Sequence, residues 1–165
     1  MAKKVKSSAW RVDKIVAISR GGLVVARIFS DLLNLPISHL TIESYQDLKQ
    51  KKQTRITEIP KKSFVDQQLL LVDEVSDTGK TFKRALSYFK RFPNCKLMTL
   101  CLYIKPITKP LPDFWQERFD GWIIYPYEIK ETYEALVKMY KSSQKAKEKM
   151  LEVGFEEWEL SNLKT

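Results

Sequence analysis

The chain has 165 residues, of which 44% are hydrophobic and 30% are charged, a composition that fits one soluble globular domain and excludes a disordered chain. No apolar run approaches the roughly 18 residues of a membrane helix, and no apolar stretch follows the basic N-terminus as in a secretory signal, so we expect a cytoplasmic protein without membrane contact. The net charge of +9 fits a phosphate-rich small ligand, a nucleic acid or a soluble surface, but the scattering of the basic residues disfavours a dedicated nucleic-acid surface.

The first half of the chain alternates between apolar and amphipathic segments. Residues 14–19 form a short apolar run that predicts a buried strand. Residues 23–35 repeat apolar side chains at helical spacing, which predicts a helix that Pro36 ends. Residues 37–44 alternate like a strand with one wetter face, whereas the lysine-rich residues 45–62 predict a long mobile loop.

The second half continues this alternation before it becomes helical. The expected elements are a buried strand at 68–73, a helix at 80–92, a buried strand at 96–104, a proline-rich loop at 105–121, a short last strand at 122–125 and one long helix from Glu131 past Lys149. The acidic tail carries two aromatic side chains, so we expect it to pack back or to meet a partner.

Continuous apolar strands between helices indicate an α/β fold with a doubly wound, mostly parallel sheet that helices cover on both faces. We expect a single domain over residues 1–165, with a core at about 13–128 and a helical C-terminal extension at about 129–165. Such sheets bind ligands beyond the carboxyl ends of their strands. The candidate site therefore lies in the segments SRGG, DEVSDTGKT, IKP and WIIYPYE, which follow the expected strands.

The chain holds two cysteines, Cys95 and Cys101, and one histidine, His39. Within one strand the cysteines would lie about 20 Å apart, beyond disulfide reach, so we expect both to be free core residues. A zinc site and a histidine-based nucleophilic triad are disfavoured, and His39 is expected to be a structural residue at a strand edge.

The segment LLLVDEVSDTGKTF, residues 69–82, joins an expected strand to an expected helix through a loop that ends in Gly-Lys-Thr. A nucleotide-binding P-loop has the same ending, but its first glycine would fall at Glu74. A carboxylate at that position prevents close backbone approach and would repel a phosphate. A P-loop is therefore excluded.

The remaining interpretation of this loop is a cradle for one terminal phosphate at the start of a helix. Asp73 and Glu74, just upstream, could accept hydrogen bonds from two vicinal hydroxyls or hold a hydrated Mg²⁺. A phosphate beside a diol describes a ribose 5-phosphate. Asp77 stays open between a helix N-cap and a chemical role. The candidate phosphate ligands are Ser76, Asp77, Thr78, Gly79, Lys80 and Thr81.

This segment resembles the motif with which type I phosphoribosyltransferases bind 5-phosphoribosyl 1-pyrophosphate (PRPP), where hydrophobic residues and an acidic pair precede Asp-Thr-Gly-x-Thr. The resemblance covers most of residues 13–128. It implies the fold of that family with a small base-binding hood, Mg²⁺ as cofactor, PRPP and a base as substrates, and a homo-oligomer, either dimer or tetramer.

A phosphoribosyltransferase must also hold pyrophosphate, and the segment ISRGGLV after the first strand suits that task. Ser19 and Arg20 bring a hydroxyl and a forked positive charge. Gly21 and Gly22 allow backbone N–H groups to approach oxygen atoms. The alternative is a plain strand-to-helix turn.

The resemblance places Ser44 and Tyr45 at the start of a loop that closes over the active site and excludes water. A Ser-Tyr pair at this point is typical of the 6-oxopurine branch of the family. A charged surface loop is the alternative.

The segments LYIKPITKPLPDF and DGWIIYPYE resemble the base pocket of xanthine-guanine phosphoribosyltransferases. By that resemblance Lys105 donates to the purine 6-oxygen and Trp122 stacks on the ring. The backbone of Ile123 would meet the N1/C2 edge, and Val75 would cover the other face of the ring. A surface lysine and a core tryptophan are the alternative.

The implied reaction is ribosyl transfer from PRPP to N9 of a 6-oxopurine, with release of pyrophosphate and with Mg²⁺ shared between the leaving group and the acidic pair. Asp77 would lie near N7 as general base or hydrogen-bond acceptor. Two positions depart from this branch, since Glu74 and Glu128 stand where aspartate is common, which leaves Glu128 only a further candidate metal ligand.

Two rival functions remain. One is a regulator with this fold that binds RNA and uses the PRPP pocket as a sensor, which the charge of +9 permits. The other is an enzyme for orotate or adenine, which the pairing of IKP with WII disfavours.

Overall fold

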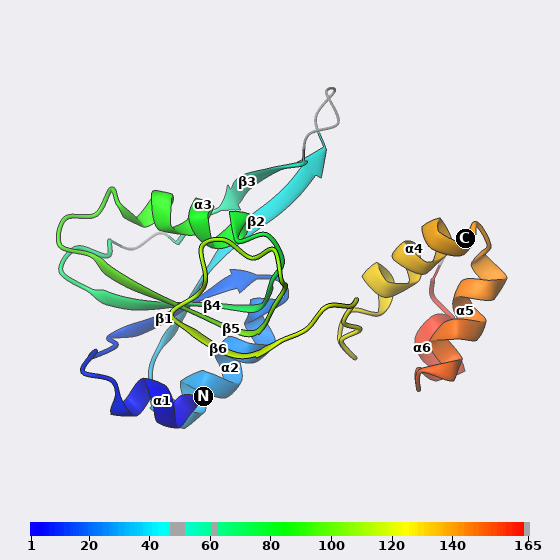
Figure 1. The fold of residues 1–165 in the computed structure, drawn as a ribbon, viewed down its shortest axis with the longest axis horizontal. Helices are drawn as coiled ribbons and strands as arrows, with labels where there is room; N and C mark the ends of the chain where they lie inside the picture. Colours follow the sequence, from blue (N-terminus) through cyan, green and yellow to red (C-terminus); the bar gives the residue numbers. More distant parts are fainter. Residues whose placement is uncertain (47–51, 61–62, 164–165) are drawn as a thin grey trace. The chain divides into compact units, whose positions relative to one another are not determined.

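The computed structural model describes residues 1–46, 52–60 and 63–163. The chain forms two compact units, Met1–Asp120 and Gly121–Thr165 (Figure 1). The expectation of a single domain with a helical C-terminal extension stays a prediction.

The first unit is built on a six-stranded sheet with the order β3-β2-β1-β4-β5-β6. Each pair of neighbouring strands is parallel except β2 and β3, which are antiparallel. This mostly parallel α/β sheet confirms the predicted fold class. The strands are β1 (Lys14–Ser19), β2 (Ile37–Gln46), β3 (Lys52–Glu58), β4 (Gln68–Ser76), β5 (Lys96–Ile104) and β6 (Phe114–Arg118).

Helices cover both faces of this sheet, as Figure 1 shows. On one face, α3 (Lys80–Phe89) packs its Phe82 and Phe89 into a cluster with alternate residues of the central strands, such as Leu69 and Leu71. On the other face, α2 (Gly22–Leu33) and the short α1 (Ala2–Ser7) pack against the residues in between, such as Leu70. Because successive strand residues face opposite sides, burial on both sides requires the continuous apolar runs found in the sequence.

The antiparallel strand β3 corrects the prediction of one loop over 45–62. Ile56 pairs with Ile42 of β2 and packs on the core, while its neighbours Arg55 and Thr57 are exposed. The sequence of β3 is KQTRITE, in which Ile56 is the one apolar residue, so no apolar alternation marked it as a strand. Residues 47–51 and 61–62 of the predicted mobile loop lie outside the described residues.

The last strand also differs from the prediction. Residues 114–118 form β6 inside the expected proline-rich loop, whereas residues 122–125 are not a strand. Phe114 and Trp115 pack on opposite faces of the sheet. Asp113 directly precedes the strand, and its Oδ2 accepts hydrogen bonds from the N–H and the hydroxyl of Thr99 in β5, both at 2.8 Å. The prolines before it masked this short edge strand.

The second unit contains α4 (Ile129–Tyr140), α5 (Ser143–Glu152) and α6 (Glu157–Leu160). The prediction of one long helix is wrong, because Lys141 has a positive φ of 52° and Ser142 caps α5 by accepting the Lys145 N–H at 3.2 Å. The acidic tail packs back, with Phe155 and Leu160 buried in the cluster of this unit.

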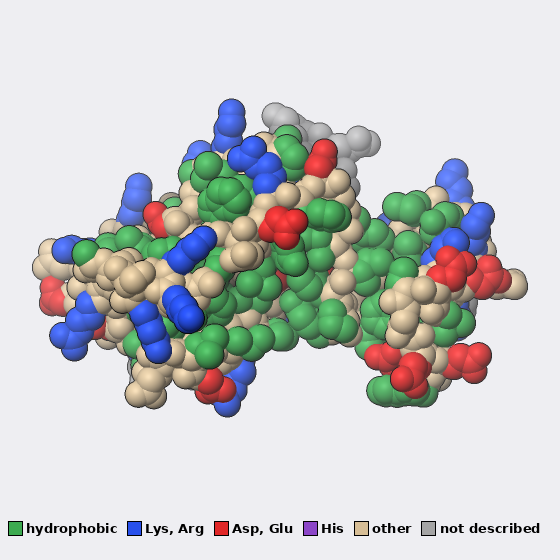
Figure 2. All heavy atoms as spheres, turned by 60° about the horizontal axis from the view of Figure 1, so that its bottom comes forward, with side chains coloured by type: hydrophobic (Ala, Val, Ile, Leu, Met, Phe, Trp, Pro, Cys, Tyr) green, Lys and Arg blue, Asp and Glu red, His purple; other side chains and the backbone are tan. Residues whose placement is uncertain are grey.

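Two surface features bear on the expected partners. Within the described part of the chain, no helix is long and apolar enough to cross a membrane. On the face drawn in Figure 2, lysine and arginine side chains are spread among apolar and acidic ones and do not gather into a single stripe. The expectation against a nucleic-acid surface stays a prediction.

Candidate active site

The carboxyl ends of β1 and β4 lie side by side because the two strands are adjacent and parallel, with Ala17 opposite Val72. This arrangement brings the predicted pyrophosphate turn onto the predicted acidic pair. A Cβ added to Gly21 would collide with the Glu74 carboxylate, and one added to Gly22 would collide with the Val72 carbonyl. Glycine is therefore needed at position 22, where the neighbour is backbone, whereas at position 21 the neighbour is the end of a side chain that can move. A cis peptide bond joins Ser19 to Arg20 in the same turn.

The acidic pair ends a buried strand. Asp73 is only 7% exposed, and its Oδ1 accepts the N–H of Glu74 at 3.1 Å. Opposite it in β5 lies Cys101, whose burial, together with the Asp73 carboxylate, raises the pKa of the thiol to about 12. Cys101 therefore stays protonated and is an unreactive core residue beside Asp73.

The donor chemistry of this pair fits Mg²⁺, which takes one or two protein carboxylates and completes its shell with water and substrate phosphates. The described residues contain no group of three or more His, Cys, Asp and Glu side chains placed to hold a metal. Asp73 and Glu74 are consecutive, and the glycine turn that is expected to hold pyrophosphate abuts Glu74. The metal role of the pair stays a prediction.

The phosphate loop runs from the end of β4 to the start of α3, over residues 76–81. Its N-cap is Gly79, with a φ of 79°, and no side chain in the described residues caps α3. The capping role considered for Asp77 is therefore wrong, and its side chain is exposed. Lys80 is also exposed and Thr78 and Thr81 are half-buried, whereas the Ser76 hydroxyl points into the interior, without a hydrogen-bond partner among the described residues.

The predicted base lysine follows β5 and contacts this loop. The Lys105 N–H donates to the Ser76 carbonyl at 3.1 Å, and the Lys109 N–H donates to the Thr78 carbonyl at 3.3 Å. The Lys105 ammonium lies 5.2 Å from the centre of the Phe119 ring, within range of a cation–π interaction. Phe119 was missed in the sequence because it lies in a segment predicted to be loop, and no local pattern marks it.

The remaining predicted site residues are not tested by this geometry. Val75 is half-buried in β4. Trp122, Ile123 and Glu128 belong to the second unit, where Trp122 is 48% exposed and Glu128 directly precedes α4. The backbones of residues 44 and 45 pair with β3, so Ser44 and Tyr45 lie in β2, and the loop that they were expected to open lies outside the described residues.

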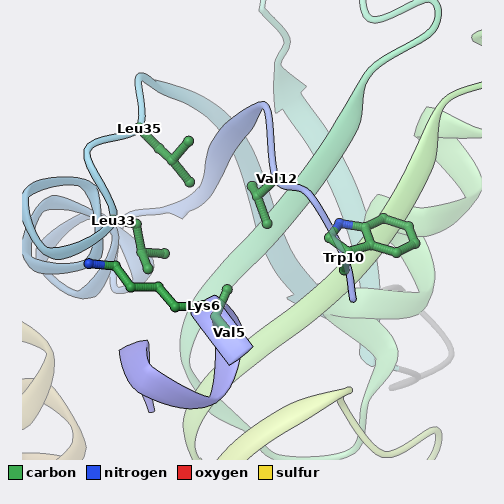
Figure 3. A pocket seen from close by; sticks show the side chains of 6 residues that line it. All are labelled: Val5, Lys6, Trp10, Val12, Leu33 and Leu35. Carbon is green, nitrogen blue, oxygen red and sulfur yellow. The ribbon is translucent and has the colours of Figure 1, made fainter. Parts of the chain in front are cut away.

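A cavity of about 130 Å³ lies elsewhere, at the opposite end of the strands from the candidate site (Figure 3). Val12 precedes β1 and Leu35 precedes β2, so this cavity lies by the amino ends of the strands. Its lining is formed by the residues labelled in Figure 3, which are Val5, Lys6, Trp10, Val12, Leu33 and Leu35. It is separate from the candidate site.

The titratable residues that were predicted to be structural take no part in the site. His39 lies in β2 with its Nε2 3.3 Å from Glu58 of β3, and this contact lowers the pKa of the glutamate. Among the described residues β3 pairs with β2 only from Thr41 onward, so His39 lies where β2 pairs with β1 alone, which agrees with the predicted strand-edge position. Cys95 and Cys101 are both free, as predicted, although Cys95 precedes β5 rather than lying in it.

The fit between Gly79 and the loop after β5 can be tested by substitution. Gly79→Ala should lower the free energy of unfolding by about 2–4 kcal/mol, because alanine resists the positive φ and its Cβ would collide with the Lys109 carbonyl. Gly154→Ala is the matched control, since Gly154 has a φ of 103° but nothing within 4 Å of the added Cβ. It should cost only about 1 kcal/mol. Equal losses in urea unfolding would show that the Lys109 contact does not constrain the loop.

The family model of the phosphoribosyl transferase domain matches residues 1–132. The xanthine-guanine phosphoribosyltransferase of Idiomarina loihiensis is 30% identical over 122 residues, which span 72% of this chain and 73% of that protein. A purine phosphoribosyltransferase structure from Pyrococcus horikoshii has a TM-score of 0.70 and 29% identity, covering 76% of this chain and 83% of that one. A xanthine-guanine-hypoxanthine phosphoribosyltransferase from Helicobacter pylori, at 22% identity and a TM-score of 0.68, covers 86% and 89% and supports the fold.

Proposed function

Because the chain belongs to the purine branch of the phosphoribosyltransferase family, we propose that it transfers the 5-phosphoribosyl group of PRPP to N9 of guanine, xanthine or hypoxanthine and releases pyrophosphate. Such a reaction serves purine salvage. The observation that carries the proposal is the contact between the turn of Gly21 and the carboxylate of Glu74. It supports one continuous surface for the pyrophosphate and the ribose of PRPP.

Each part of PRPP has a matching group in the first unit. The guanidinium of Arg20 and the backbone N–H groups of Gly21 and Gly22 would bind the pyrophosphate. Asp73 and Glu74 would accept hydrogen bonds from the two ribose hydroxyls. The amino end of α3, which begins at Lys80, would hold the 5-phosphate through free backbone N–H groups.

Asp73 and Glu74 would also hold Mg²⁺, which when bound would offset the negative charge of the leaving pyrophosphate. During transfer the bond from ribose C1 to the pyrophosphate oxygen breaks, and a bond from C1 to purine N9 forms. Asp77 would accept the proton that the purine loses, since its exposed carboxylate directly follows the end of β4. By the family resemblance, Trp122 and the backbone of Ile123 are further candidates for binding the base.

Lys105→Ala should lower kcat/KM for guanine about 10- to 100-fold, because a charged donor to the 6-oxygen is lost. The affinity for PRPP should change less than about twofold, since Lys105 touches only the base in this account. Steady-state kinetics with each substrate varied gives both numbers. Lys96→Ala at the other end of β5 is the control and should leave both unchanged. Equal losses for guanine and PRPP would refute the assignment of Lys105 to the base.

The function is tested by incubating the protein with PRPP, Mg²⁺ and each of guanine, xanthine, hypoxanthine, adenine and orotate. We expect nucleotide from one or more of the three oxopurines only. Nucleotide from adenine or orotate alone would show that the protein uses another base as its substrate. PRPP binding without any nucleotide would favour the regulator. We also propose that the protein acts in the cytoplasm as a dimer or tetramer, which sedimentation of the purified protein would test.

A further inference from the structure

Thr108 is a buried polar residue in the loop that follows β5, with only 3% of its surface exposed. Its hydroxyl oxygen accepts the Lys105 N–H at 2.9 Å. The same hydroxyl is within hydrogen-bond reach of two carbonyls of the phosphate loop, those of Ser76 and of Asp77, the latter at 2.8 Å. A threonine hydroxyl has one proton and two lone pairs. It therefore links the base lysine to the phosphate loop through one atom.

The surrounding backbone repeats this link. The Ser76 carbonyl accepts from the Lys105 N–H, and the Thr78 carbonyl accepts from the Lys109 N–H. Together with the bond from Thr108 to Asp77, three consecutive carbonyls of the phosphate loop receive hydrogen bonds from residues 105–109. The far end of the same segment is tied to β5 through Asp113 and Thr99. We call residues 105–113 the strap.

A purely local role for Thr108 would look different. The turn of the strap is closed by the bond from the Thr108 N–H to the Lys105 carbonyl at 3.1 Å, and this bond does not need the side chain. The hydroxyl instead reaches residues 31 and 32 positions earlier in the chain, in the phosphate loop. Because Thr108 is buried, water cannot readily replace its hydroxyl as the partner of these groups, so loss of the hydroxyl costs free energy.

We propose that Thr108 is a positioning residue that sets the separation between the base site at Lys105 and the 5-phosphate site at residues 76–81. The inference rests on the proposed function and deepens it. A purine nucleoside 5′-monophosphate spans both sites, whereas ribose 5-phosphate has no base and does not reach the base site. Loss of the hydroxyl therefore weakens binding of the joined ligand and leaves the half-ligand nearly unaffected.

The test compares Thr108→Val, which keeps the shape and removes the hydroxyl, with Thr108→Ser, which keeps the hydroxyl. Calorimetry with GMP and with ribose 5-phosphate measures the two affinities. We expect Thr108→Val to bind GMP about tenfold more weakly and ribose 5-phosphate within about twofold of wild type. Thr108→Ser should recover most of the GMP affinity. The control is Thr132→Val, a buried threonine in the second unit, which should change neither.

An equal loss for both ligands, no loss for either, or no recovery in Thr108→Ser would overturn the proposal. Amide exchange of the ligand-free protein then separates this inference from the proposed function. The Lys105 amide should exchange about tenfold faster in Thr108→Val and near the wild-type rate in Thr108→Ser. If wild type binds neither ligand but the two variants show this exchange pattern, the proposed function fails and the link between Thr108 and Lys105 stands. Unchanged exchange of Lys105 overturns the link even if GMP binds.

Discussion

Asp77→Asn is expected to lower kcat by about 10²- to 10⁴-fold while the melting temperature stays within about 2 °C of wild type. The amide keeps the size of the side chain but cannot take the proton that the purine loses. Stability should be spared because Asp77 is exposed and Gly79, not Asp77, caps α3. Initial rates at saturating PRPP and guanine, with a thermal melt of the same sample, give both values.

The matched control for this variant is Asp31→Asn on the outer side of α2, where Asp31 forms an exposed ion pair with Arg27 at 2.6 Å. An exposed pair of this kind contributes little to stability. Asp31→Asn should leave both rate and melting temperature unchanged. If Asp77→Asn kept its activity and lost stability instead, Asp77 would be a structural residue rather than a base.

The two glycines of the pyrophosphate turn should respond differently to the same added methyl group. Gly22→Ala should lower the free energy of unfolding by about 1–3 kcal/mol, because its Cβ meets the backbone at Val72 and Asp73, which cannot move aside. Gly21→Ala should fold nearly as well, since its Cβ meets only the carboxylate of Glu74, at the end of a flexible side chain. Displacing that carboxylate should weaken PRPP binding about tenfold or more.

Urea unfolding and PRPP titration in the presence of Mg²⁺ measure the two effects on both variants. Each variant serves as the control for the other, because the chemical change is identical and the positions are adjacent. A Gly21→Ala variant that binds PRPP like wild type would separate the turn from the substrate. Unchanged stability in Gly22→Ala would contradict the packing of the turn on β4.

The buried centre of the sheet was predictable because burial on both faces leaves continuous apolar runs. The predicted strands at 14–19 and 96–104 match β1 and β5 to the residue. Strands at the sheet margins left weaker signals. In β3 a single isoleucine faces the core between the exposed Arg55 and Thr57, and the residue before β6, Asp113, accepts hydrogen bonds from Thr99 of β5. Such strands depend on contacts distant in sequence, which local patterns do not contain.

The candidate site was likewise predictable only in part. The rule that ligands bind at the carboxyl ends of parallel strands led to the glycine turn, the acidic pair and Lys105. It could not reveal that Gly21 lies on Glu74, since this contact depends on how β1 and β4 pair. Thr108 and Phe119 were also beyond sequence reasoning. Each acquires its role from a neighbour in the folded chain rather than from its own segment.

The most direct test of the proposed transfer reaction supplies PRPP and Mg²⁺ with guanine, xanthine, hypoxanthine or adenine at equal concentration, and measures nucleotide and pyrophosphate together. We expect nucleotide from at least one of the three oxopurines, with one pyrophosphate released for each nucleotide formed, and no AMP from adenine. AMP alone, or no nucleotide from any of the four bases while PRPP binds, would contradict the proposed reaction.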